Sequence, residues 1–339
     1  MAFKRVTMQD IADACGLSRN TVSKVFNGRG SVPEATRQLV LARARDLGYS
    51  QSPAEPEARE KGSIALLAQH KLLSHSFGAF FITSFTDRIS RAGFTMKYFE
   101  ISAPEIAQRR LPSRLELEDT AGILTIELFD RGYLDMLCTL GKPTVVVDGF
   151  ARAGETLMDC DYISMENRAS EAALVRRMLR AGARRVGFVG DVEHCNSFYE
   201  RWQGCCLALS EAGLSFDRSC SILAEDSELY GDPAWLGLQL DAMPALPDGF
   251  ACANDYLAIH LMTALKKRGL RIPGDVMVAG FDGTLEASLV EPALSTAQIP
   301  GKEIGAMAAA LLCARIRTPD QPLRRVYVQS APVPGASIR

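Results

Sequence analysis

The sequence predicts an α/β protein in which a small three-helix head precedes a long, two-lobed body of parallel sheets with flanking helices. Three observations predict this class. Residues 6–49 read as three short helices separated by glycines and helix-capping residues. Residues 50–62, SQSPAEPEAREKG, hold two prolines, three glutamates and no large apolar side chain, which is typical of a linker. From residue 63 onward, short apolar runs alternate with amphipathic stretches.

The first helix of the head is predicted from its capping residues. Thr7 followed by Asp10 resembles a capping box, which starts a helix at Met8, and Gly16 ends it. Leu17 can then pack inward. The apolar face of this helix is formed by Ile11, Ala12 and Cys15.

The second helix is predicted over residues 19–27, with Ser18 as its cap and Gly28 at its end. Its buried side is expected to contain Val22, Val25 and Phe26. Its opposite side carries Arg19, Asn20, Ser23 and Lys24. Two helices joined by a tight glycine-containing turn form a helix-turn-helix pattern, which needs a third helix to close its core.

The third helix is predicted to begin with Pro33 at its first helical position and to end at Gly48. Its core positions are expected to be Thr36, Val40, Ala44 and Leu47.

The charge of the chain is divided unevenly. The total is −2, yet residues 1–50 carry eight Lys and Arg against four Asp and Glu, so the remainder is acidic. A basic head on an acidic body indicates that the head meets a polyanion. A recognition helix in the major groove reads base edges with side chains near its start and one turn later, here Arg19, Asn20 and Lys24. Without the surrounding pattern, these three residues could equally be a solvated helix face.

The body contains eight apolar runs that we expect to be strands. They are 64–68, 94–101, 121–126, 143–148, 185–190, 249–253, 276–281 and 326–328. Helical patterns lie between most of them, at 77–92, 168–181, 201–212, 255–268 and 301–315. Around 275 residues are too many for one open sheet of this kind, so we expect two lobes.

The sequence lacks the motifs that are typical of several classes of protein. There is no apolar stretch long enough to span a membrane and no secretory signal, so the expected compartment is the cytoplasm. The nine cysteines and four histidines are dispersed without metal-ligand spacing, so no metal or other cofactor is expected. Dinucleotide-binding, P-loop and nucleophile-elbow motifs are missing too, so we expect no enzyme and no catalytic residues.

Polar residues at the ends of predicted strands indicate a ligand site between the lobes. In parallel sheets, ligands bind at the carboxyl ends of the strands. The candidates are Asp148, Arg201 at the opening of a helix, Asn254, Asp255 and Asp282. Carboxylates, an amide and an arginine suit a polyhydroxyl compound. Asp255 has an alternative role as the cap of the helix that follows it.

With these residues in view, the chain resembles the lactose-repressor family of bacterial transcription regulators over nearly its whole length. The head matches V-T-x-x-D-[IV]-A at 6–12, G-[LV]-S at 16–18, T-V-S-[KR]-V-x-N at 21–27, T-R at 36–37 and L-G-Y at 47–49. The body adds AGARRVGFVG at 181–190, ERWQG at 200–204, AND at 253–255, RGLRIPGDVMVAGFDGT at 268–284 and PALSTAQ at 292–298.

The resemblance implies a helix-turn-helix DNA-binding head on a periplasmic-binding-protein-like core of the ribose type. The expected domains are residues 1–50, a linker or degenerate hinge at 51–62, and an effector-binding and dimerisation core at 63–339. Within the core we expect a first lobe of about 63–160 and 298–320, and a second lobe of about 161–297 and 321–339.

The resemblance also implies residue roles. DNA phosphates would be contacted by Thr7, Ser18, Thr21, Ser23, Asn27 and Tyr49. In the effector site, Phe77 would stack on the apolar face of a sugar, and Gln298 would add a polar contact.

Three features depart from the family. The hinge position that usually carries a minor-groove leucine is about Ala58, and Pro56 and flanking glutamates precede and follow it, so we predict weaker operator bending. Gly149 stands where ribose-type sites carry an arginine, and His75–Gly78 replaces N-P-F-F. The ligand therefore stays open among a different pentose or hexose, a nucleoside, or something larger.

These features together predict a homodimer, joined through its bodies, that binds a palindromic operator and responds to a small effector, a monosaccharide or derivative. We expect a repressor of a carbohydrate uptake or catabolism operon that the effector releases. The alternative is a corepressor-dependent regulator that senses a nucleoside, purine or other non-sugar metabolite. A free-standing transport binding protein fits the body alone, but the head and the missing signal argue against it.

Overall fold

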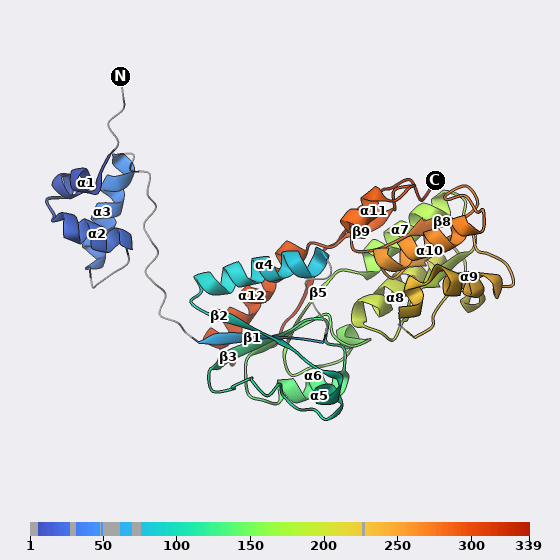
Figure 1. The fold of residues 1–339 in the computed structure, drawn as a ribbon, viewed down its shortest axis with the longest axis horizontal. Coiled ribbons are helices and arrows are strands. Elements are labelled where there is room, and N and C mark those ends of the chain that lie inside the picture. The colour runs from blue at the N-terminus through green and yellow to red at the C-terminus, as the bar shows by residue number, and fades with distance from the viewer. Residues whose placement is uncertain (1–5, 28–31, 48, 50–61, 70–75, 226–227) are drawn as a thin grey trace, which may run out of the picture. The chain divides into compact units, whose positions relative to one another are not determined.

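The computed structural model describes residues 6–27, 32–47, 49, 62–69, 76–225 and 228–339. The chain divides into two compact units, Met1–Lys61 and Gly62–Arg339. Figure 1 shows a helical first unit and a second unit in which sheets are flanked by helices, so the predicted α/β class with its three-helix head is confirmed.

The head contains α1 (Met8–Cys15), α2 (Arg19–Asn27) and α3 (Glu34–Asp46). The predicted capping box is present, since the Thr7 backbone N–H donates to Asp10 Oδ2 at 2.7 Å and the Asp10 N–H donates to Thr7 Oγ1 at 3.4 Å. Gly16 ends α1 in the left-handed conformation at φ +64°. The three helices bury a core of Ile11, Ala12, Val22, Val25, Phe26, Val40 and Ala44.

The predicted third helix differs at both ends. Pro33 occupies the N-cap with an extended ψ of 141°, one residue before the helix, rather than the first helical position. The helix ends at Asp46, and the side chain of Leu47 at the C-cap is 38% exposed instead of buried. Once the helical repeat stops, a side chain no longer projects along the apolar stripe.

The first lobe is a six-stranded parallel sheet in the order β10-β5-β4-β3-β1-β2. Its strands are β1 (Ser63–Ala68), β2 (Thr95–Glu100), β3 (Thr120–Thr125), β4 (Thr144–Val147), β5 (Asp161–Met165) and β10 (Arg325–Val328). Helices α4 (Ser76–Arg91) and α12 (Gly301–Arg317) cover one face, while α5 (Ala103–Ala107) and α6 (Arg131–Cys138) lie on the other, as Figure 1 shows.

This sheet corrects the expected lobe boundaries, because β5 and β10 were assigned to the second lobe. Both belong to the first sheet, where β5 pairs with β4 and β10 pairs with β5. A buried ion pair fixes β5 there, since Arg315 on α12 donates from Nε and Nη2 to the two carboxylate oxygens of Asp161, each at 2.9 Å. The sequence reading missed β5 because a charged residue begins it.

The second lobe contains the parallel strands β6 (Val186–Val189), β7 (Gly249–Cys252) and β8 (Met277–Ala279), and an antiparallel pair, β9 (Thr296–Gln298) and β11 (Ala331–Val333). Helix α7 (Arg168–Arg180) packs on α8 (Asn196–Glu211), and α9 (Pro233–Asp241) packs on α10 (Asp255–Lys267). The short helix α11 (Leu285–Leu289) follows β8, and 3-10 turns lie at η3 (Arg218–Cys220) and η4 (Glu228–Gly231), while a further 3-10 turn, η2 (Ala153–Glu155), lies between β4 and β5 of the first lobe.

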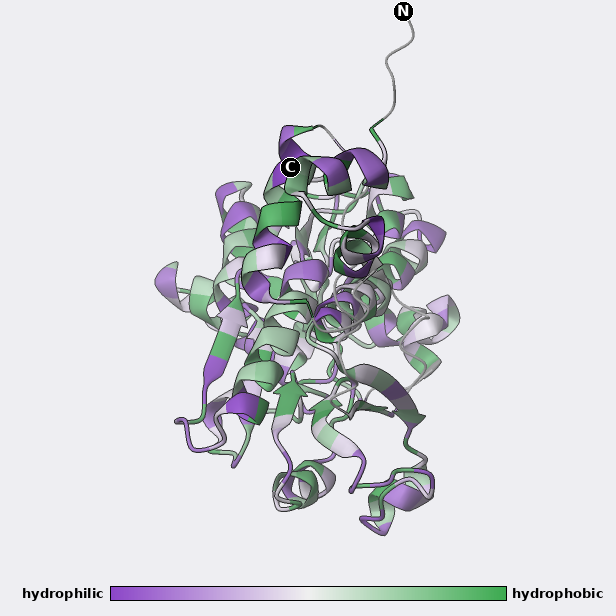
Figure 2. Ribbon diagram, turned by 90° about the vertical axis from the view of Figure 1, so that its left-hand side faces the viewer, coloured by the Kyte–Doolittle hydropathy of each residue, from purple (hydrophilic) through white to green (hydrophobic). Residues whose placement is uncertain are grey.

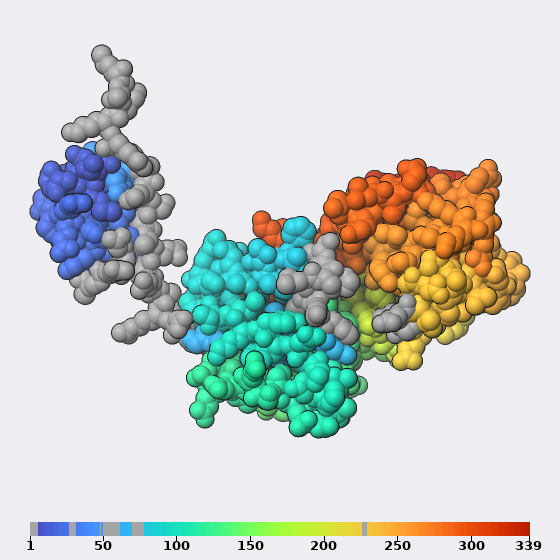
Figure 3. Space-filling model, in the orientation of Figure 1, coloured from blue at the N-terminus to red at the C-terminus, as the bar shows by residue number. Residues whose placement is uncertain are grey.

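Since β5 and β10 belong to the first lobe and β6 to β9 and β11 belong to the second, the chain crosses between the lobes after β5, after β9 and after β10. Figure 2 shows hydrophobic colour on several strands and mixed colours along the helices, as expected for sheets covered by amphipathic helices. Figure 3 shows one face of both lobes, with residues of the first in cyan to green and those of the second in yellow to orange.

Candidate functional site

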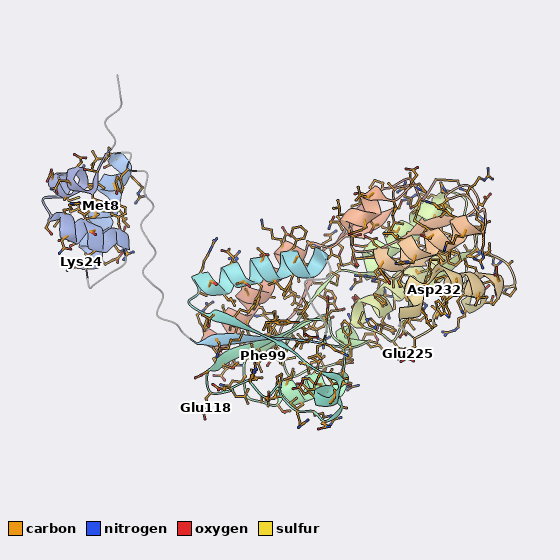
Figure 4. The ribbon with its side chains drawn as sticks, viewed as in Figure 1. Met8, Lys24, Phe99, Glu118, Glu225 and Asp232 are labelled. Atoms are coloured by element: carbon orange, nitrogen blue, oxygen red, sulfur yellow. The ribbon has the colours of Figure 1, made fainter. Side chains whose placement is uncertain are left out.

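The first candidate site is the outer side of α2. Arg19, Asn20 and Lys24 are exposed, whereas Val22, Val25 and Phe26 on the opposite side are buried in the head. Figure 4 labels Lys24 on α2 and Met8 at the start of α1. Three long polar side chains therefore project from two successive turns of one helix, the arrangement that reads base edges in a major groove.

The hydroxyls expected at phosphates already make hydrogen bonds within the head. Thr7 Oγ1 donates to Asp10 Oδ2 at 2.6 Å, so a phosphate would compete with Asp10 for that proton. Ser18 Oγ accepts from the Thr21 N–H at 3.0 Å and shares one hydrogen bond with Thr21 Oγ1 at 2.8 Å. Of the Ser18 and Thr21 hydroxyl protons, one therefore stays available for a phosphate.

The other residues with an implied phosphate contact lie around the same helix. Ser23 and Tyr49 are half-buried, and the Tyr49 ring packs edge-on against Phe26 with centroids 5.2 Å apart. Asn27 is the last residue of α2, and its side chain lies outside the described part of the chain. The linker, with Pro56 and the hinge position at Ala58, also lies outside the described residues.

The second candidate site lies where strands of both lobes end, and it is centred on Arg201. This side chain is 2% exposed. Its Nε donates to Asn167 Oδ1 at 3.0 Å, and its Nη1 donates to the Ala253 carbonyl at 2.6 Å and to Asp282 Oδ1 at 3.1 Å. Arg201 was expected to open its helix, but α8 begins at Asn196, so Arg201 lies in the second turn.

Asp148 follows β4 and faces the start of α8. Its side chain accepts a hydrogen bond from Ser197 Oγ to Oδ2 at 2.8 Å. Its other oxygen, Oδ1, is buried and has no hydrogen-bond partner among the described residues. A buried carboxylate oxygen without a donor is unfavourable, so this oxygen is ready to accept a hydrogen bond from a ligand.

A third carboxylate, which sequence reasoning missed, joins these residues. Glu127 follows β3 by two residues and is half-buried. The signal in the sequence was an acidic residue directly after the apolar run 121–126, the same pattern that singled out Asp148. We call Glu127, Asp148, Arg201 and Asp282 the carboxylate site.

The backbone at the carboxylate site is strained. All three of its acidic residues have positive φ, at +49° for Glu127, +66° for Asp148 and +118° for Asp282. Residues other than glycine rarely adopt this conformation, and such strain is concentrated at functional sites. The strand ends are therefore shaped to direct three carboxylates into one region.

Burial and mutual repulsion change the acidity of these carboxyl groups. The pKa of Asp148 is raised to about 6, mainly by loss of hydration and also by the nearby Glu200 charge, against the lowering effects of the Ser197 hydrogen bond and of Arg201. Loss of hydration also raises the pKa of Asp282 to about 6, against the lowering effect of Arg201. The pKa of Glu127 rises to about 7 through burial and the charges of Asp282 and Asp148.

Asn254 and Asp255 make hydrogen bonds within the protein that differ from the roles predicted from the sequence. Asn254, expected in the effector site, is the N-cap of α10, where its Oδ1 accepts from the Leu257 N–H at 2.9 Å. Asp255 was the expected alternative cap, but it is fully buried and accepts from the Thr284 N–H at 2.8 Å and from Thr296 Oγ1 at 2.6 Å. The cap is one residue earlier than expected because α10 starts at Asp255.

Of the last two residues predicted to bind the effector, the structure describes the side chain of Gln298 but not that of Phe77. Gln298, at the end of β9, is exposed, and its Nε2 donates to the Asp282 carbonyl at 3.4 Å. Phe77 lies in the first turn of α4, and its side chain, like residues 70–75, is outside the described part of the chain.

A hollow elsewhere on the body shares no residue with the carboxylate site. It has a volume of about 440 Å³ and is lined by Glu166, Ala169, Ser170, Ala173, Tyr327, Gln329, Ser330 and Pro332, around the segments that join the lobes. In the part of the chain that the structure describes, no group of three or more His, Cys, Asp or Glu side chains is arranged to hold a metal ion. No helix among those residues is long and apolar enough to cross a membrane.

Comparison with known proteins matches both units. Residues 7–52 match the model of bacterial regulatory proteins of the lacI family, and residues 175–338 match a periplasmic binding protein-like domain. The regulator CelR of Thermobifida fusca is 28% identical, over 92% of each chain. The ribose operon repressor of Haemophilus influenzae is 27% identical, over 98% of each chain. A solved CelR–cellobiose complex superimposes with a TM-score of 0.73 at 25% identity, covering 98% of this chain and 100% of the other.

Proposed function

Because this chain belongs to the lacI family of bacterial regulatory proteins, we propose that it represses transcription of a carbohydrate operon until a small sugar-like effector releases it from DNA. The single observation that supports DNA recognition is the row of exposed side chains on α2, Arg19, Asn20 and Lys24, above a buried apolar side. A role on operator DNA would place the protein in the cytoplasm.

The head would bind DNA in two ways. Arg19 or Lys24 would donate to guanine, and Asn20 would pair with adenine, each good pair contributing about 1–3 kcal/mol of discrimination. Thr7, Ser18, Thr21, Ser23, Asn27 and Tyr49 would contact phosphates and set the register without reading sequence. Two heads in a homodimer joined through the bodies would match a palindromic operator.

The carboxylate site would hold the effector. Asp148, Arg201 and Asp282 would bind its hydroxyl groups, with Phe77, Asn254 and Gln298 around them. The regulator whose structure is similar was solved with cellobiose, and one relative is named for a ribose operon, which supports a sugar-like ligand. The effector would act by binding one lobe arrangement more tightly than the other.

The test begins with an operator selected by the full-length protein from random DNA duplexes. In a gel-shift titration, the double variant Arg19→Ala, Lys24→Ala should lose the retarded band while its circular dichroism spectrum stays unchanged. The matched control is Arg43→Ala, Arg45→Ala, which removes the same charge from the exposed surface of α3 and should retain the sequence-specific complex. An unchanged shift with the α2 variant would contradict the proposal.

One further titration determines whether the effector lowers or raises the affinity of the protein for its operator. An effector that lowers operator affinity supports release, whereas one that raises it favours the corepressor alternative. Linkage requires the operator to change effector affinity by the same factor, which provides an independent check.

A further inference from the structure

The carboxylate site has more acidic than basic side chains among the described residues. Glu127, Asp148 and Asp282 lie close enough for their charges to act on one another. Glu200 acts on Asp148 in the same way, and Asp282 acts on Asp255. Among the described residues, five carboxyl groups that act on one another in this way therefore lie at or next to a site with one buried arginine.

That arginine has little capacity left to neutralise a ligand or its neighbours. Arg201 Nη1 donates to Asp282 Oδ1 at 3.1 Å, Nε donates to Asn167, and the guanidinium lies 3.8 Å from the centroid of the Phe281 ring. The N-terminus of α8 is the positive end of its helix dipole, and Ser197 in its first turn donates a hydrogen bond to Asp148. This end of the helix therefore stabilises the negative charge of one carboxylate, that of Asp148. Among the residues that the structure describes, Asp148 and Glu127 nevertheless form no ion pair of the kind that joins Asp282 to Arg201.

The carboxyl groups differ in how well the protein satisfies them. Glu200 accepts from Asn167 Nδ2 at 2.8 Å and from Tyr327 Oη at 2.9 Å, and Asp255 accepts from two threonines. Asp148 is 8% exposed, and no donor to its Oδ1 lies in the part of the chain that the structure describes. The unmet requirement of the site is therefore a hydrogen-bond donor, and preferably a positive charge, beside Asp148.

Aromatic residues are close neighbours in the chain of the residues that form this site. Phe129 lies two residues after Glu127, and its ring centroid is 4.9 Å from that of His194. His194 in turn is 5.1 Å from Phe198, the neighbour of the Ser197 that binds Asp148. Aromatic faces attract cations as well as the apolar faces of sugars. The carboxylates, with aromatic residues close to them in the chain, therefore provide the chemical groups that suit an ammonium group.

We propose that the effector is a polyhydroxylated compound carrying an ammonium group, which binds between Glu127 and Asp148 while Asp282 and Arg201 hold its hydroxyls. The inference rests on the proposed function, because it names the chemical class that the effector site would take. Sugar acids and sugar phosphates would be repelled by the same carboxylates.

The experiment is a thermal-shift and calorimetric comparison with the full-length protein and ligands of matched skeleton. The amine set is glucosamine, galactosamine and mannosamine. The other sets are the parent hexoses, their N-acetyl derivatives, the corresponding uronic acids, and Mg²⁺ and Ca²⁺ alone. We expect an amine to raise the melting temperature by mass action and to bind at least about tenfold more tightly than its parent hexose, about 1.4 kcal/mol.

Variants connect this preference to the named side chains. Glu127→Gln removes the charge but retains the size, so it should reduce the preference for the amine over its parent hexose by about tenfold, which is the loss of about 1.4 kcal/mol. Asp148→Asn should do the same. Glu118→Gln, which removes the same charge from an exposed residue before β3, is the matched control and should leave the preference unchanged.

Several outcomes would overturn the inference. They are equal or tighter binding of a neutral or acidic ligand, no stabilisation by any amine, stabilisation by the divalent cations alone, and an amine preference that survives both variants. The proposed function fails separately. If a neutral sugar binds and releases the operator, the proposed function stands but the ammonium group is refuted. If an amine binds without any effect on operator affinity, the preference for an ammonium group stands but the proposed function is refuted.

Discussion

The outer side of α2 in the head and the carboxylate site in the body both carry arginine side chains, but these are exposed to solvent in the head and buried in the body. Arg19 and Lys24 are exposed and come from six consecutive residues of one helix. Arg201 is 2% exposed, and its partners Asn167, Ala253 and Asp282 come from segments far apart in the chain. An exposed arginine can be replaced at little cost to the fold, but a buried, paired one cannot.

The two regions also differ in backbone conformation. The head uses a regular helix with ordinary caps at Thr7 and Ser18. The carboxylate site uses three acidic residues with positive φ, each within three residues of the end of a strand. The head can therefore be altered by single side chains without refolding, whereas the carboxylate site depends on the lobes that hold it.

The largest effect is expected from Arg201→Ala. It removes the hydrogen bonds that Arg201 donates to Asp282 Oδ1 and Asn167 Oδ1, and breaking a buried ion pair in this way costs about 3–5 kcal/mol of unfolding free energy. Urea denaturation of the full chain measures the change. The control is Arg176→Ala, because Arg176 and Glu211 form an exposed ion pair at 2.7 Å that should contribute less than about 1 kcal/mol. Equal losses would remove the distinction between the regions.

The next effect concerns Glu171 on α7, which is fully buried, and neither of its carboxyl oxygens has a hydrogen-bond partner among the described residues. Burial raises its pKa to about 8. Since this folded-state pKa is above the unfolded one, its stabilising contribution is complete below about pH 4.5 and is lost as pH rises through about 8.

Glu171→Gln should remove that dependence. Between pH 6 and 8, unfolding free energy of the unsubstituted protein should fall relative to the variant by up to about 1.4 kcal/mol per pH unit. Urea titrations at several pH values measure the two slopes, and exposed Glu118→Gln should follow the unsubstituted protein. Parallel curves for Glu171→Gln would show that this group does not titrate with folding.

A smaller effect is expected in the head. Arg19→Ala should weaken selected operator binding by about 1–3 kcal/mol and relax sequence preference at one base position. Unfolding free energy should change by less than about 0.5 kcal/mol, because the side chain is exposed. Binding to a panel of single-base operator variants provides the readout. A uniform loss across all sequences would indicate a phosphate contact instead.

The smallest effect is expected from Ser18→Ala, which removes the N-cap of α2. The Thr21 N–H loses its acceptor at 3.0 Å, which should cost about 1 kcal/mol of local stability. Hydrogen exchange of the α2 amides reports this loss in the full chain. Ser84→Ala, within α4 of the body, is the control and should leave exchange in the head unchanged.

Much of the fold follows from local patterns in the sequence. Thr7, Asp10 and Gly16 mark α1 because caps and left-handed glycines act within a few residues. Apolar runs such as 143–148 and 249–253 predict β4 and β7 because a buried parallel strand needs apolar side chains on both faces. The polar residues that follow such runs predict where a ligand site lies.

Long-range contacts decided what these patterns could not. Only the tertiary structure placed β5 in the first sheet, through Asp161 and the distant Arg315. Only it assigned the cap of α10 to Asn254 and brought Glu127 to Asp148 and Asp282. By itself the sequence determined the three helices of the head, its basic surface and the alternation of strands and helices, because these depend on neighbouring residues. The charge balance of the carboxylate site depends on residues more than a hundred positions apart, which only folding brings together.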